Sequence, residues 1–90
     1  MRYMVIERFR NDSAAIVYAR AREHGRQLPK GLSYVDSWVT ESFDRCFQIM
    51  ETEDPALFEP WVAAWSDFVD FEIVPVMDSA QAASHFATET

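Results

Sequence analysis

Residues 33–52, SYVDSWVTESFDRCFQIMET, contain the pattern that decides the fold. Two stretches in this segment, 33–40 and 45–52, alternate between side chains of different polarity and are rich in β-branched and aromatic residues, which predicts two strands. The four residues between them, 41–44, are enough for a turn. The two strands are therefore expected to pair as a hairpin.

Further elements follow on both sides of this hairpin. Side-chain oxygens of Asn11, Asp12 and Ser13 can cap a helix, and Asp54-Pro55 places a capping aspartate before a proline at the first helical position. The elements expected in chain order are strands at residues 2–9, 33–40, 45–52 and 69–77, helices at residues 13–26 and 55–66, and a short helix at about residues 80–86 after Asp78-Ser79.

The order β-α-β-β-α-β at this length predicts an α+β fold of the ferredoxin-like type. Its antiparallel sheet has the strand order 4-1-3-2, which agrees with Pro75 because proline is tolerated on an edge strand. Two helices can cover only one face of the sheet. We expect one domain at residues 1–78, followed by a short helix or tail at residues 79–90.

Composition excludes several classes of protein. A net charge of −7 argues against binding to nucleic acid, since such binding depends on neutralising phosphates. One cysteine permits no internal disulfide and no cysteine-based zinc cluster. Charged residues interrupt the N-terminus before a signal sequence can form, and no apolar run reaches the ~20 residues of a membrane span. A cytoplasmic protein without a membrane segment is the expectation.

Alternation divides the side chains of each strand between two faces of the sheet. We assign the more uniformly apolar set of each strand to the helix-covered core. The other set is still largely apolar, and such a face is expected to be covered by a second copy, giving a homodimer in the form of an α/β barrel with a partly polar cavity. The expected core set comprises Met4, Ile6, Val35, Val39, Phe47, Ile49, Phe71 and Ile73, and the opposite set has one central polar residue per strand, namely Glu7, Asp36, Gln48 and Glu72.

Four segments of the chain resemble a small bacterial family, the domain-of-unknown-function family 3303. They are MVIERF (residues 4–9), LPKGLSYVDSW (residues 28–38), RCFQIMET (residues 45–52) and WSDFVDFEIVPV (residues 65–76). The resemblance covers roughly residues 2–86 and implies a dimeric α/β-barrel of ferredoxin-like fold. It implies no reaction. Broader relatives by fold include cofactor-free monooxygenases, haem-degrading enzymes, isomerases and stress-responsive barrels, but a shared fold does not fix a function.

The polar residues of the second face are the first candidates for a site. Three carboxylates in a half-apolar cavity raise one another's pKa and can supply a general base, and with Gln48 they can hold a hard cation. Alternatively, each carboxylate pairs with an arginine such as Arg8 or Arg45. Trp38 and Tyr34, together with Tyr3, form either a wall for a flat ligand or a dimer core. Cys46, in mid-strand, is best interpreted as a small buried hydrophobe.

The predicted ligand-binding set is Glu7, Tyr34, Asp36, Trp38, Cys46, Gln48 and Glu72, with no metal and no cofactor. We predict a homodimer that binds a small organic ligand between its sheet and helices and has neither nucleic acid nor membrane as a partner. Two alternatives stay open. One is a cofactor-independent monooxygenase- or isomerase-like enzyme in which Glu7, Asp36 or Glu72 takes a proton. The other is a structural interaction module with a filled barrel.

Overall fold

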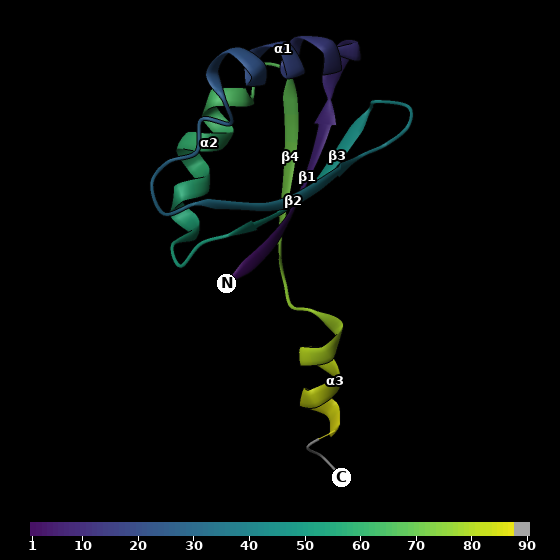
Figure 1. Ribbon diagram of the computed structural model, residues 1–90, viewed down its shortest axis with the longest axis vertical. Coiled ribbons are helices and arrows are strands. Elements are labelled where there is room, and N and C mark those ends of the chain that lie inside the picture. Colours follow the sequence, from purple (N-terminus) through teal and green to yellow (C-terminus); the bar gives the residue numbers. More distant parts are fainter. Residues whose placement is uncertain (88–90) are drawn as a thin grey trace.

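The elements follow one another in the order β-α-β-β-α-β-α in the computed structural model, which describes residues 1–87 (Figure 1). Each predicted element is present, with ends shifted by a few residues at most. Two short 3-10 turns, Arg10–Asp12 and Pro55–Leu57, lead into the first two helices. The strands are β1 (Arg2–Phe9), β2 (Ser33–Val39), β3 (Arg45–Glu51) and β4 (Val69–Val76), and the helices are α1 (Ala14–His24), α2 (Phe58–Trp65) and α3 (Ser79–Ala87).

The four strands form one antiparallel sheet in the order β2-β3-β1-β4. This is the predicted order, and the fold is α+β and consistent with the ferredoxin-like arrangement. Pro75 lies opposite Tyr3 of β1, on the edge strand β4. Because an edge strand leaves every second N–H group without a ladder partner, the missing N–H of a proline is tolerated there.

Helices α1 and α2 cover one face of the sheet (Figure 1). Val17 of α1 and Phe58, Trp61 and Trp65 of α2 belong to the buried core together with side chains of the strands. The ring of Phe58 meets that of Tyr3 edge to face, with centroids 5.2 Å apart. Full burial of side chains of this size contributes about 2–3 kcal/mol each, which holds the helix layer on the sheet.

The two helices begin and end differently from one another. Asp54 accepts a hydrogen bond from the backbone N–H of Ala56 at 3.1 Å, so the predicted start before α2 is confirmed. Before α1, the Ser13 hydroxyl caps no helix N–H group and instead donates to the carbonyl of Phe68 at 3.0 Å. Gly25 ends α1 with a φ of 69°, a left-handed conformation that glycine adopts without strain.

The face assignment made from the sequence is wrong on β1 and β3. Val5 and Met50 are fully buried on the helix side, and Glu7 is 6% exposed there. Met4 and Ile6 face the other way and are only half-buried. The physical reason is the length of β1: the set of Tyr3, Val5 and Glu7 continues to Phe9, and this larger, partly aromatic set fits under the helices.

On β2, a bulge changes the faces in mid-strand. Tyr34 pairs with Met50 and Asp36 pairs with Ile49, so that Val35 is an extra residue between them. Residues separated by two positions normally share a face, but one inserted residue reverses this. Tyr34 and Asp36 therefore lie on opposite faces. On β4, the assignment of Phe71 and Ile73 to the helix side agrees with their half-buried positions.

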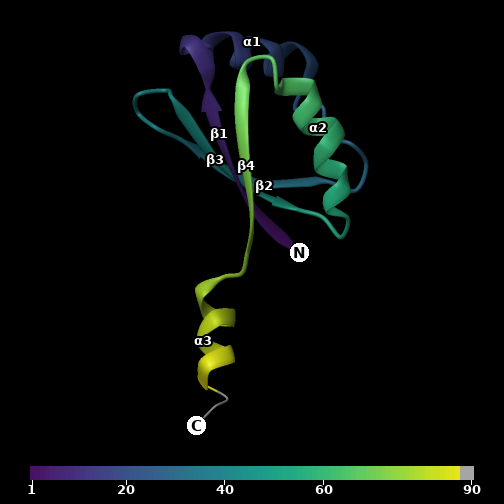
Figure 2. The same cartoon turned by 180° about the vertical axis from the view of Figure 1, so that it is seen from behind.

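Helix α3 stands apart from the sheet and its two helices in both views (Figures 1 and 2). Asp78 and Gln81 hold its first turn by a reciprocal pair of hydrogen bonds, in which each side chain accepts from the backbone N–H of the other, as the predicted cap requires. Met77 is 64% and Phe86 68% exposed. The radius of gyration is 15.1 Å, compared with about 12 Å for a globular chain of this length.

Candidate functional site

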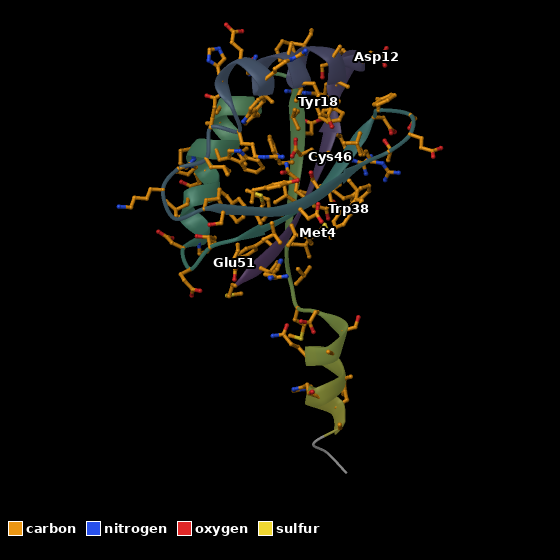
Figure 3. The ribbon with its side chains drawn as sticks, viewed as in Figure 1. Met4, Asp12, Tyr18, Trp38, Cys46 and Glu51 are labelled. Carbon is orange, nitrogen blue, oxygen red and sulfur yellow. The ribbon has the colours of Figure 1, made fainter. Side chains whose placement is uncertain are left out.

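A cavity of about 100 Å³ lies between the sheet and the two helices that cover it. Strands β1 and β3 contribute Glu7, Cys46 and Gln48, while α1 contributes Val17, Tyr18 and Ala21. Figure 3 shows Tyr18 and Cys46 below α1. The remaining lining residues are Phe9, Arg26, Ser37, Trp61 and Trp65. Mostly apolar walls with a few polar groups are typical of a small-molecule site.

Glu7 is the most unusual group in this cavity. Its side chain is buried, and Oε2 has no hydrogen-bond partner. Loss of hydration disfavours the charged carboxylate and raises its pKa from 4.5 to about 7, while the positive charge of Arg26 acts in the opposite direction. An unsatisfied buried polar atom destabilises a protein by about 1–3 kcal/mol. The buried, unpaired carboxyl group of Glu7 therefore lowers the stability of the fold.

Arg26 lies just after the end of α1, and four contacts fix its position. Its backbone carbonyl accepts hydrogen bonds from the indole N–H groups of both Trp61 and Trp65, at 3.1 and 3.2 Å. Its guanidinium carbon lies 3.5 Å from the centroid of the Tyr34 ring, a cation–π contact. One guanidinium nitrogen donates to Oε1 of Gln48 at 3.4 Å. Among the described residues, no ion pair joins Arg26 to Glu7, although both line the cavity.

Cys46 lies beside Glu7 on the neighbouring strand, as its direct partner in the β1–β3 register. Burial first, and then the nearby carboxylate of Glu7, raises the pKa of its thiol to about 12. A nucleophilic cysteine requires the opposite shift, because the thiolate is the reactive form. Cys46 therefore serves as a small apolar wall residue.

The model described as "Domain of unknown function (DUF3303)" matches residues 1–89. The chain belongs to the DUF3303 family. No curated protein and no solved structure matches it. The comparisons therefore give this DUF3303 protein a family but no activity.

The fold brings only part of the predicted site together in this DUF3303 protein. Glu7, Cys46 and Gln48 line the cavity. Tyr34 joins them from the same face, where its hydroxyl lies 2.7 Å from Oγ of Ser37. Asp36, Trp38 and Glu72 lie on the opposite face and are exposed, with Trp38 on the side away from α2 (Figure 3).

The predicted cluster of Glu7, Asp36, Gln48 and Glu72 therefore does not form. In residues 1–87, no group of three histidine, cysteine, aspartate or glutamate side chains is placed to hold a metal ion. Over the same residues, no helix has the length and apolar character needed to cross a membrane.

Sequence reasoning missed most of the helix-side lining of the DUF3303 cavity. Trp61 and Trp65 of α2 are both buried in the core and walls of the cavity. Phe9 shares the alternation of Glu7 and could have been found by extending the first strand to its last residue. Arg26 had no such signal, because its position depends on how the chain leaves α1 and meets the two indoles.

Proposed function

We propose that this protein binds a small organic ligand in the cavity between its sheet and helices. The unpartnered, buried Oε2 of Glu7 is the observation that supports this most strongly. Native proteins pair nearly all buried polar atoms, and the exceptions call for a physical reason. A ligand that donates a hydrogen bond to Glu7 supplies that reason.

A second feature of the cavity supports the same proposal. Aromatic side chains of Phe9, Tyr18, Trp61 and Trp65 surround the few polar groups. Such walls bury an apolar ring, while the polar groups orient it. The cavity also contains both a potential acceptor, on Glu7, and potential donors, on Arg26 and Gln48.

Backbone amide NMR tests this proposal with four single-ring probes: phenol, benzamide, benzoate and benzylamine. We expect at least one to cause saturable shifts at Glu7, Tyr18 and Gln48 but not at Trp38 or Glu72. Ala21→Leu is the matched variant, since it adds volume to the cavity wall on α1 without harming helix propensity. Shifts confined to the open face, or binding unchanged by Ala21→Leu, would contradict the proposal.

A second candidate function is proton transfer without a cofactor. A general base works best when its pKa lies near the operating pH, and the pKa of Glu7 is about 7. Arg26 faces the same space and can stabilise an anion that forms there. The test is deuterium exchange at the carbon next to the carbonyl of cyclohexanone. Acceleration by the wild-type protein that Glu7→Gln abolishes supports catalysis, and equal rates with both proteins count against it.

The open face of the sheet supports the proposal of a homodimer. Strand pairing places a half-buried apolar group at its centre, formed by Met4, Ile6, Phe47 and Ile49, and Trp38 and Val74 extend it toward the two edges. Charges of both signs surround this centre, namely Arg2, Arg8, Asp36, Arg45, Glu51, Asp70 and Glu72. An apolar centre with a polar rim is the usual anatomy of a protein interface.

A second copy is the occupant that best suits this surface. Arg8 is the cross-strand partner of Arg45 on one side and of Asp70 on the other, so that two arginines share one neighbouring carboxylate. A two-fold partner with the same mixed rim can set carboxylates against these arginines. Sedimentation equilibrium tests the proposal: a dimer is expected, and a monomer at micromolar concentration would contradict it.

A further inference from the structure

The size of the cavity limits what can enter it, given the ligand-binding function proposed above. An apolar cavity of roughly 150 Å³ accommodates one benzene ring. The volume of about 100 Å³ found here is smaller, so a single ring already fills the cavity and any further part of the ligand lies outside its opening.

The charges in the cavity disfavour an ionic ligand. Glu7 supplies a carboxyl group within it, and Arg26, exposed to solvent, supplies a guanidinium at its edge. Above the pKa of Glu7, which is about 7, its carboxylate repels a ligand anion, and Arg26 repels a ligand cation at any pH. Moving a further charge between aromatic walls also carries a desolvation penalty. A neutral ligand avoids both effects.

The hydrogen-bonding groups of the cavity define which donors and acceptors a ligand needs. Oε2 of Glu7 is an acceptor without a donor. The Gln48 oxygen already accepts from Arg26 at 3.4 Å, so the amide N–H groups of Gln48 and the remaining N–H groups of Arg26 are donors. We infer that the ligand is a compact, neutral, single-ring compound that carries an N–H or O–H donor for Glu7 and a carbonyl-type acceptor for Arg26 and Gln48.

The protonation of Glu7 makes this pattern depend on pH. Above its pKa of about 7, Glu7 is a carboxylate and accepts hydrogen bonds only, so a ligand without a donor leaves its charge unpaired. Below that pKa, the protonated carboxyl donates to the carbonyl of either kind of ligand. Discrimination between ligands with and without a donor is therefore greatest at alkaline pH.

Two nearly identical probes test the inference. 2-Pyridone is a neutral single ring with an N–H donor beside a carbonyl, and N-methyl-2-pyridone lacks only the donor. Dissociation constants are measured from amide shifts of the full chain at about pH 8.5 and about pH 5.5, on either side of the pKa of Glu7. Benzoate and benzylamine serve as the anionic and cationic probes.

At the higher pH, we expect 2-pyridone to bind roughly tenfold more tightly than N-methyl-2-pyridone, as a hydrogen bond to a charged group implies. The ratio is expected to fall at the lower pH and to become independent of pH in Glu7→Gln. The comparison of the two pyridones on the wild-type protein is sufficient to test the inference even if Glu7→Gln does not fold.

The outcomes separate this inference from the proposed function on which it rests. Equal binding of the two pyridones, or tighter binding of benzoate or benzylamine at the cavity, overturns the ligand class and leaves the cavity as a binding site. Shifts in no cavity residue with any of these probes count against both.

Discussion

The two faces of the sheet are formed by alternate residues of the same strands, but they differ in where polar and apolar side chains lie. The helix-covered face holds Glu7 and Gln48 among aromatic side chains, and the open face leaves Ile6 and Phe47 only half-buried with Trp38 57% exposed. A monomer built for stability alone would place these residues the other way round. The covered face therefore encloses a small polar-and-aromatic cavity, and the open face keeps the apolar surface on which we propose that a second copy binds.

The largest expected effect concerns the covered face. Trp61 is 3% exposed, and its ring centroid lies 5.2 Å from that of Phe71. Its indole N–H donates a hydrogen bond to the carbonyl of Arg26. Trp61→Ala is expected to lower the free energy of unfolding by about 3–5 kcal/mol, because it leaves a large void in the core. Urea denaturation measures this. Phe43→Ala, at an exposed ring in the β2–β3 turn, should change it by less than about 0.5 kcal/mol. Similar losses in the two variants would mean that the burial of Trp61 on the covered face adds nothing to stability.

The next prediction concerns the pH dependence of stability. Burial raises the pKa of Glu7 from 4.5 to about 7, so between these values the folded state binds a proton that the unfolded state releases. The contribution of Glu7 to stability is therefore favourable at low pH, is lost as pH rises through this window, and amounts to about 3 kcal/mol in full.

Glu7→Gln removes this titration. The variant is expected to match the wild type near pH 4.5 and to exceed its free energy of unfolding near pH 8 by up to about 3 kcal/mol. Urea denaturation across the pH range checks the sign. A difference between the two proteins that stays constant with pH would mean that Glu7 is not desolvated on the covered face.

The third prediction concerns a substitution on the open face of the sheet. Trp38→Glu places a charge within the proposed dimer surface and removes a large aromatic side chain from it, which is expected to weaken dimerisation roughly 30-fold or more. Phe43→Glu is the matched control, since Phe43 is 63% exposed but lies in the turn. Sedimentation equilibrium compares the two. Equal weakening, or none, would show that the open face does not bind a second copy.

The smallest effect separates local capping from packing. Asp54→Ala removes the side-chain hydrogen bond to the N–H of Ala56 and should lower the free energy of unfolding by about 1 kcal/mol. The loss is expected to be well below that of Trp61→Ala, because burial on the covered face holds α2 in place. If Asp54→Ala lowered the free energy of unfolding as much as Trp61→Ala, the cap rather than burial would hold α2 in place.

Local signals were sufficient to predict the fold. Alternation located each strand, Asp54-Pro55 located the start before α2, and Pro75 placed β4 at an edge, as the sheet order confirms. These features depend on neighbours in sequence and are visible without a structure.

The assignment of side chains to the two faces of the sheet depends on contacts that cannot be read from the sequence. The bulge at Val35 separates Tyr34 from Asp36, and nothing in the alternation distinguishes a bulge from a regular strand. Apolarity also misled the assignment on β1, since the covered face holds Glu7 and the open face holds Met4 and Ile6. Arg26 reaches the cavity through a carbonyl held by two indoles, a long-range contact without a local pattern.

The most direct test of the central claim is an NMR titration of the glutamate side-chain carboxyl carbons. We expect one glutamate with a midpoint near the pKa of about 7 that burial gives Glu7, and we expect this titration to be absent in Glu7→Gln. If every glutamate titrates near the ordinary value of about 4.3, Glu7 is hydrated, and the two faces do not differ as described.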